Sequence, residues 1–275
     1  MARPTFPKPD GKRGVDAGSP VQLRLHELRS RIFGNMRMLR VWLPPGYDER
    51  ETVYPALYLN DGQNLFEPAT AFAGVHWRAG ETANRLILEK KIRPLIIVGI
   101  DNTGKSRARE YIPYKSLDLK VSHPQGKLYP AFLRDEVMPL IERNYRVLKG
   151  RENCGLGGSS LGGLITLYTQ LAAPRTFARL LIESPSLFVA NRRVLKECRK
   201  AREWPLRVYL GMGTRETGDA LKDEKFTNDA RELAGILRKA GLDENRLRVR
   251  IQEGGTHSES AWAARFPEAL EFLYS

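Results

Sequence analysis

The sequence predicts an α/β fold with a mostly parallel central sheet, helices on both faces of the sheet and antiparallel strands at the start. Three observations predict it: apolar runs typical of strands buried on both faces, helical patterns between these runs, and a glycine-rich turn from one strand into a helix. The 275 residues suffice for one large domain, expected over residues 21–275 because nothing there resembles a linker. Residues 1–20, rich in Pro, Gly, Lys and Asp, are expected to form a flexible tail.

Alternating apolar and polar residues predict two N-terminal strands joined through Gly34-Asn35, a hairpin signal. After them, apolar runs alternate with helical patterns, the order that produces parallel strands covered by helices. The expected strands are 21–31, 36–43, 54–59, 95–100, 152–157, 180–182, 206–210 and 246–251. The expected helices are 79–90, 129–144, 161–171, 192–202, 224–240 and 259–273, with a polar, basic loop at 101–126.

A glycine-flanked serine lies between the strand 152–157 and the helix 161–171. The pattern Gly158-x-Ser160-x-Gly162 fits the nucleophile elbow, a strained turn that lifts one side chain above the sheet. A β-carbon at either glycine would clash with the neighbouring strand or helix. Ser160 is therefore the candidate nucleophile, at the positive end of the following helix. An ordinary turn between a strand and a helix is the alternative interpretation.

A serine hydroxyl needs a nearby base before it can attack an ester. The sequence has four histidines, and His257 follows the last predicted strand after several small residues. Its loop emerges at the same edge of the sheet as Ser160, so His257 is the expected base. The other three are expected to be solvated or structural: His26, His76 and His123.

The acid should follow the nucleophile and precede the histidine along the chain. The strand 206–210 leads into a turn in which Glu216 is the carboxylate nearest the strand end. A carboxylate there would hold the imidazole in the productive tautomer and stabilise the imidazolium. Two alternatives stay open: Asp219 is the acid, or Glu216 is a surface residue paired with Arg215.

An oxyanion needs hydrogen-bond donors. The amide of Leu161, directly after the candidate nucleophile, supplies one. The amide of Gln63, in the turn 60–64 after a buried strand, is expected to supply the second, with Gly62 allowing a close backbone approach. A simple Asx turn accounts for the same residues without catalysis.

The chain is strongly basic, with 45 Lys and Arg against 32 Asp and Glu and a formal net charge of +13. The basic residues are dispersed and no nucleic-acid-binding module is recognisable, so a solvated surface is the preferred interpretation. Steering of an anionic substrate and nucleic-acid binding are the alternatives. Two cysteines are too few for a disulfide framework, and no segment has the pattern of a signal peptide or a membrane helix. We expect a cytoplasmic protein with no nucleic-acid or membrane partner; the sequence leaves its oligomeric state open.

The loop 101–126 is a candidate substrate-recognition element. Its basic and aromatic residues include Lys105, Arg107, Arg109, Tyr111, Tyr114 and Lys115. Such a loop would suit an anionic or aromatic acyl group, for example a ferric catecholate or a hydroxycinnamate. The candidate substrate-binding residues are Arg109, Tyr111 and, from an earlier loop, Trp77. A solvated basic loop unrelated to substrate is the alternative.

A set of segments carries a resemblance to a known family. In order along the chain, they are 57–66 (LYLNDGQNLF), 98–102, 109–111, 158–163 (GSSLGG), 183–186 (ESPS), 213–216 (GTRE) and 255–257 (GTH). They resemble the esterase-D-like branch of the α/β-hydrolases, which includes enterochelin-type siderophore esterases, feruloyl and acetyl-xylan esterases, S-formylglutathione hydrolase and mycolyltransferases. The resemblance covers about residues 21–275.

The resemblance implies an α/β-hydrolase fold and a serine esterase site. Ser160 would be the nucleophile, His257 the base and Glu216 the acid, at a position where relatives often carry Asp. The amides of Gln63 and Leu161 would form the oxyanion hole. The expected function is hydrolysis of a small-molecule carboxylic ester through an acyl-serine intermediate, without a metal or cofactor. An acyltransferase, or a non-catalytic binding protein on the same scaffold, is the alternative.

Overall fold

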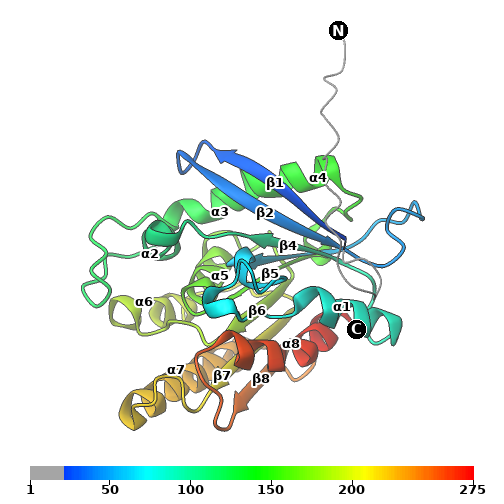
Figure 1. Ribbon diagram of the computed structural model, residues 1–275. Helices are drawn as coiled ribbons and strands as arrows, with labels where there is room; N and C mark the ends of the chain where they lie inside the picture. The colour runs from blue at the N-terminus through cyan, green and yellow to red at the C-terminus, as the bar shows by residue number, and fades with distance from the viewer. Residues whose placement is uncertain (1–21) are drawn as a thin grey trace.

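An eight-stranded sheet forms the centre of the computed structural model, which describes residues 22–275 (Figure 1). The expected tail at residues 1–20 lies outside the described residues. The strands are β1 (Gln22–Ser30), β2 (Asn35–Leu43), β3 (Ala56–Asn60), β4 (Ile96–Ile100), β5 (Cys154–Ser159), β6 (Arg179–Glu183), β7 (Arg207–Gly213) and β8 (Leu247–Gln252). Their order is β1-β2-β4-β3-β5-β6-β7-β8. Strand β2 is antiparallel to β1 and β4 and all other pairs are parallel, so the predicted fold class is confirmed.

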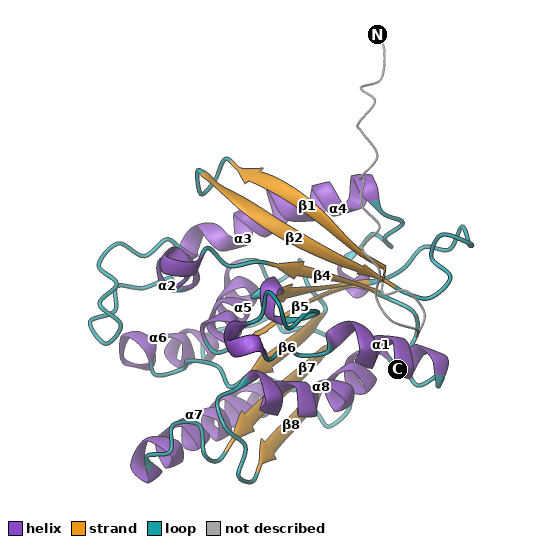
Figure 2. Cartoon of the chain, viewed as in Figure 1, coloured by secondary structure: helices purple, strands orange, loops and turns teal. Residues whose placement is uncertain are grey.

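Helices cover both faces of this sheet (Figure 2). They are α1 (Ala79–Leu88), α2 (Arg107–Tyr111), α3 (Tyr129–Phe132), α4 (Met138–Asn144), α5 (Leu161–Ala172), α6 (Val189–Cys198), α7 (Ala220–Lys239) and α8 (Glu259–Tyr274). Residues of α1 and α8 belong to one hydrophobic core, and residues of α3 to α7 belong to the other. Among residues 22–275, no helix has the length and apolar character needed to cross a membrane.

The inner strands supply alternate side chains to the two cores, because successive residues of a strand point to opposite faces. In β3, Ala56 and Tyr58 pack in the core beneath α5, whereas Leu57 and Leu59 pack in the core beneath α1 and α8. All residues of β3 and β4 are buried. This two-sided burial explains why these strands are continuous apolar runs in the sequence.

Several expected elements differ in detail. The predicted helix 129–144 is present, but a π-helical turn at Leu133–Val137 separates α3 from α4. The predicted helix 192–202 begins and ends earlier, as α6. The expected loop 101–126 contains the short helix α2, which is held by a buried ion pair between Glu110 Oε2 and Arg37 Nη2 of β2, 2.6 Å apart. This ion pair joins residues far apart in the sequence. The pattern of residues within the loop therefore does not predict the helix α2.

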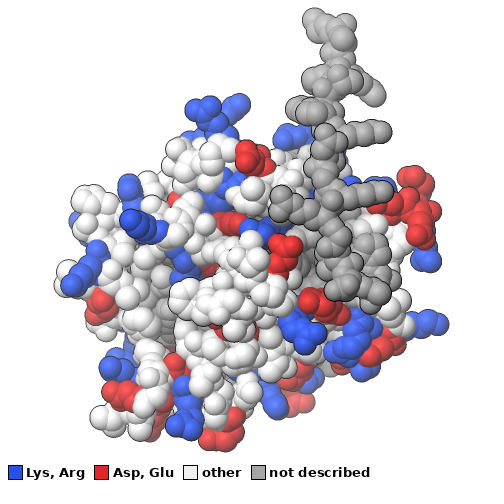
Figure 3. Space-filling model, viewed as in Figure 1, with Lys and Arg blue, Asp and Glu red and all other residues white. Residues whose placement is uncertain are grey.

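Charged side chains of both signs are interspersed on the face of the molecule drawn in Figure 3. Several arginines there and elsewhere form surface ion pairs with neighbouring carboxylates, such as Arg24 with Asp48 and Arg175 with Glu203. On that face the positive charge is therefore spread among carboxylates and does not form one continuous patch.

A buried ion pair joins the end of β6 to α8. Arg265 Nη2 and Nε donate hydrogen bonds of 2.7 and 2.9 Å to Glu183 Oε2, and both side chains are buried. Arg265 Nη1 also donates to Gln252 Oε1 at the end of β8. Burial raises the pKa of Glu183 to about 7, although Arg265 acts in the opposite direction. The pair holds α8 against the carboxyl ends of β6 and β8.

We expect the Glu183→Gln substitution to flatten the pH dependence of stability. The pKa of this carboxyl is about 7 in the folded protein, against an ordinary value of 4.5. Its contribution to stability is therefore complete below pH 4.5 and is lost as the pH rises through about 7. The free energy of unfolding of the wild type should therefore fall across this interval as the pH rises, and this group's contribution to the fall should be absent in the variant. Urea denaturation, followed by tryptophan fluorescence across the interval, measures the slope.

The matched control is Glu203→Gln, which removes an exposed carboxylate paired with Arg175. It should leave the slope between pH 4.5 and 7 close to that of the wild type, since exposed ion pairs contribute little. An equal slope in the wild type and in the Glu183→Gln variant would contradict the assignment.

Candidate active site

Ser160 occupies the turn between β5 and α5 in a strained backbone conformation, with φ 59° and ψ −123°. The Ser160 amide donates a 2.9 Å hydrogen bond to the carbonyl of Glu183, and the Ser186 amide donates to the carbonyl of Ser160 at 3.1 Å. A β-carbon on Gly158 would lie 2.9 Å from Cβ of Asn60, closer than such atoms approach. Contacts with β6 and β3 therefore hold the sharp turn that the sequence predicts.

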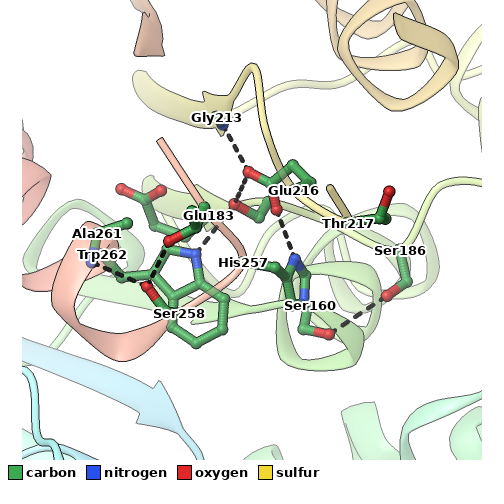
Figure 4. A network of polar contacts seen from close by, with 12 residues as sticks. Ser160, Glu183, Ser186, Gly213, Glu216, Thr217, His257, Ser258, Ala261 and Trp262 are labelled. Atoms are coloured by element: carbon green, nitrogen blue, oxygen red, sulfur yellow. Dashed lines mark hydrogen bonds and ion pairs between the residues drawn. The ribbon is translucent and has the colours of Figure 1, made fainter. Parts of the chain in front are cut away.

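His257 and Glu216 are in direct contact. His257 lies in the loop between β8 and α8, and Glu216 follows β7. Their Nδ1 and Oε2 atoms are 2.5 Å apart, with the Glu216 side chain 1% exposed and the His257 side chain 35% exposed. The imidazole meets the Trp262 ring edge-on, at 5.1 Å between centroids. Figure 4 shows the imidazole between Glu216 and Ser160, with the second ring nitrogen on the side of Ser160.

The second oxygen of Glu216 is held by two further donors. Oε1 accepts a hydrogen bond of 2.8 Å from Ser184 Oγ. It accepts a second one, of 2.6 Å, from the Gly213 amide (Figure 4). Ser184 Oγ in turn accepts from Trp262 Nε1 at 3.0 Å and from Arg265 Nη2 at 3.4 Å. Because two N–H groups point at the Ser184 oxygen, its own proton is directed toward Glu216. The carboxylate is thus fixed from three sides.

Asp219 has a different task. Its Oδ1 accepts hydrogen bonds from the amides of Leu221 and Lys222 and so caps the N-terminus of α7.

The other three histidines contact polar groups outside the cavity at Ser160. These pairs are His26 with Tyr145, His76 with Glu81, and His123 with Ser122. Of the four histidines, His257 lines the cavity that holds Ser160.

A cavity of about 570 Å³ opens above Ser160 and His257, and Gln63 and Trp262 also line it. The backbone amides of Gln63 and Leu161 donate no hydrogen bond to other groups within residues 22–275. The turn of Gln63 lies directly against β4, because a β-carbon on Gly62 would be 2.5 Å from the backbone of that strand. In the described part of the chain, no group of three or more His, Cys, Asp or Glu is placed to hold a metal ion.

The charges of the cavity wall largely cancel. Arg107 Nε and Nη2 donate to the two carboxylate oxygens of Asp61 at 2.6 and 2.7 Å, and Asn102 Nδ2 donates to Asp61 Oδ1 at 2.7 Å. Glu259, another wall residue, accepts from Asn64 Nδ2 and has no cationic partner among the described residues. Burial, together with nearby Asp61, raises the pKa of Glu259. The wall therefore carries one matched ion pair and one additional carboxyl group.

The structure corrects the expectation for the substrate-binding residues, since Arg109, Tyr111 and Trp77 do not line the cavity. Tyr111 is buried with its hydroxyl against the Asp61 amide, and Trp77 packs in the core against Trp262. Arg109 is exposed outside the cavity. Residues two positions apart on a helix, such as Arg107 and Arg109 of α2, do not share a face. Arg107 lines the cavity and Arg109 does not.

Sequence reasoning missed several residues of the polar network, among them Ser184 and Trp262. Ser184 belongs to the segment 183–186 that carries the family resemblance, which is the signal that could have found it. Trp262 lies on the first turns of α8, where an aromatic residue has the pattern of an ordinary core position. Its indole N–H, directed at Ser184 Oγ, and its contact with the imidazole of His257 separate it from such a residue.

Comparison with known proteins identifies the family. Residues 30–273 match the Esterase family model. The Bacillus subtilis protein YbbA is 25% identical over 246 residues, which cover 88% of this chain and 93% of YbbA. The ferri-bacillibactin esterase BesA of the same organism is 26% identical over 220 residues, covering 73% of this chain and 71% of BesA.

The fold is shared with solved structures. The siderophore hydrolase EstA from Aspergillus nidulans superposes with a TM-score of 0.75 at 20% identity, covering 98% of this chain and all of that chain. The resemblance to the enterochelin-esterase-like branch is thereby confirmed. Since the family model matches most of its length, this chain belongs to the Esterase family and is an esterase.

Proposed function

We propose that the protein hydrolyses carboxylic esters through an acyl-serine intermediate, with Ser160 as nucleophile, His257 as general base and Glu216 as the acid that orients it. One observation carries the proposal: His257 contacts buried Glu216 at 2.5 Å and lines the same cavity as Ser160. The strained turn at Ser160 and the family membership add support.

In the proposed reaction, Ser160 Oγ attacks the ester carbonyl carbon while His257 Nε2 takes the hydroxyl proton. The oxyanion accepts hydrogen bonds from the amides of Gln63 and Leu161. When the tetrahedral intermediate collapses, the C–O bond to the alcohol breaks and His257 returns the proton to the alcohol. Water, deprotonated by the same imidazole, then releases the carboxylic acid and restores the serine.

In the structure, the Ser160 hydroxyl is not yet positioned for proton transfer to His257. Its hydroxyl lies 3.5 Å from Ser186 Oγ, and the structure records no hydrogen bond between Ser160 and His257 among the described residues. Catalytic hydrogen bonds of this kind often become short only when substrate is bound. The proposal therefore requires the serine hydroxyl to turn from Ser186 toward the imidazole.

The proposed substrate is an ester of an aromatic acid, such as a feruloyl or a siderophore ester. The name of the relative BesA, a ferri-bacillibactin esterase, supports the siderophore case. Attraction of an anionic group by the loop 101–126 has less support, because the loop's cation at the cavity, Arg107, is already paired with Asp61.

We expect Ser160→Ala to lower kcat on a short-chain aryl ester by at least about 10⁴-fold, because the nucleophile is removed. A fluorophosphonate probe should label the wild type and fail to label this variant. The control is Ser186→Ala, which removes the neighbouring hydroxyl and should retain labelling. Full activity in Ser160→Ala would exclude the acyl-serine mechanism.

Substitutions of Glu216 and Asp219 should show which of the two carboxylates orients His257. We expect Glu216→Gln to lower kcat about 10³- to 10⁴-fold, since an amide cannot stabilise the imidazolium. Asp219→Ala should keep kcat close to wild type and lose about 1 kcal/mol of stability through the missing helix cap. Steady-state kinetics and thermal unfolding of both variants measure these effects. The reverse order of activities would assign the acid to Asp219.

The hydroxyl that holds Glu216 should also matter for turnover. We expect Ser184→Ala to lower kcat about tenfold with little change in KM, because the carboxylate loses one of its positioning donors. The matched variant Trp262→Phe keeps a ring beside His257 and removes the N–H directed at Ser184, so its effect on kcat should be smaller. Unchanged kcat in Ser184→Ala would show that the Gly213 amide and His257 alone position Glu216.

A further inference from the structure

Phe72 is an exposed aromatic residue at the cavity of the catalytic serine. Its side chain is 73% exposed, and it lines the cavity together with Ser160 and His257. The other large apolar side chains that are exposed within residues 22–275 do not line this cavity. Because the ring forms part of the cavity wall, a ligand that enters the cavity can contact it.

The position of Phe72 is fixed by contacts with the turn 60–64, which carries the proposed oxyanion donor Gln63. The Phe72 amide donates a 3.0 Å hydrogen bond to Asn64 Oδ1, and the Trp77 amide donates to the Asn64 carbonyl at 2.9 Å. Thr70 Oγ1 donates to the carbonyl of Gln63 at 2.8 Å. Both ends of the segment that carries the ring are thereby joined to the residues that contain the proposed oxyanion donor. Little ordering of the backbone remains for a ligand to impose.

The rest of the wall favours a neutral ligand over an anionic one. The guanidinium of Arg107 is engaged by both oxygens of Asp61, so it offers no uncompensated charge. Glu259 adds a carboxyl group without a cationic partner in the described part of the chain. A carboxylate or phosphate on the substrate would meet this group and gain no free cation. Apolar contact with the exposed ring is the attraction that remains.

We propose that Phe72 forms the stacking wall of an aryl-binding subsite. Of the two substrate classes proposed above, the subsite favours a neutral aromatic ester, such as a feruloyl ester, over an anionic siderophore ester, because ring contact and not charge holds the substrate. This inference rests on the proposed esterase function. Offset stacking of two rings adds attraction beyond the area they bury, which a saturated chain of similar size cannot match. The cavity volume of about 570 Å³ is sufficient for a single substituted ring with its ester.

The test uses the full chain and methyl esters that share one leaving group: methyl 3-phenylpropanoate, methyl 3-cyclohexylpropanoate, methyl butanoate and the 4-carboxylate derivative of the phenyl ester. Hydrolysis is followed in a pH-stat. In Phe72→Ala, the ratio of kcat/KM for the phenyl ester to that for the butanoate should fall about five- to tenfold, mainly through KM. The ratio for the cyclohexyl ester should fall less. Phe72→Tyr should restore the wild-type ratio, and the wild type should disfavour the charged ester.

Leu117→Ala is the control, since Leu117 is 96% exposed and does not line the cavity. It should leave every ratio within twofold of the wild type. An unchanged phenyl-to-butanoate ratio in Phe72→Ala, or a wild-type preference for the charged ester, would overturn the inference.

A binding measurement separates failure of the subsite from failure of the esterase function. Ligand-observed NMR with 3-phenylpropanamide compares Ser160→Ala with the double variant Ser160→Ala/Phe72→Ala. Weaker binding in the double variant supports the subsite, even if the wild type hydrolyses none of the esters. Absence of hydrolysis would overturn only the proposed esterase function. Equal binding in both variants overturns the subsite whatever the hydrolysis results.

Discussion

The parallel register of β5, β6, β7 and β8 is the constraint on which the rest of the site depends. Ser159 pairs with Glu183 and Glu183 with Gly211, while two residues further along β7 Gly213 pairs with Gln252. The residues that follow these strands therefore emerge side by side at one edge of the sheet. A shift of one residue in any pair would turn the side chains of a strand to the opposite face and separate the groups.

This edge joins the stability of the fold to the geometry of the site. Arg265 of α8 contacts both Glu183, whose carbonyl holds the Ser160 amide, and Ser184, whose hydroxyl holds Glu216. The same helix supplies Trp262, which contacts Ser184 and the imidazole of His257. Packing of α8 against the sheet thus holds Glu216 and His257 close together. Buried polar groups of this kind are stable only when their partners are all present.

The loops above the edge form much of the cavity wall. The turn 60–64, the segment of Phe72 and the helix α2 meet there, tied together by Asn64, Asp61 and Arg107. Their ion pair neutralises the cation nearest the site, so the large positive charge of the chain does not extend to this wall. The surface charge and the chemistry of the cavity are separate properties of the protein.

The sequence by itself predicted most strands and helices in their order along the chain, the sharp turn at Ser160 and His257 as the candidate base, because these predictions depend on local periodicity, turn chemistry and chain order. Only the tertiary structure distinguishes the surroundings of Glu216 and Asp219, which both satisfy chain order: one carboxylate contacts the imidazole and the other caps a helix. It likewise directed Arg107 and not Arg109 to the cavity. These choices depend on contacts between residues far apart in the chain, and no pattern of neighbouring residues records such contacts.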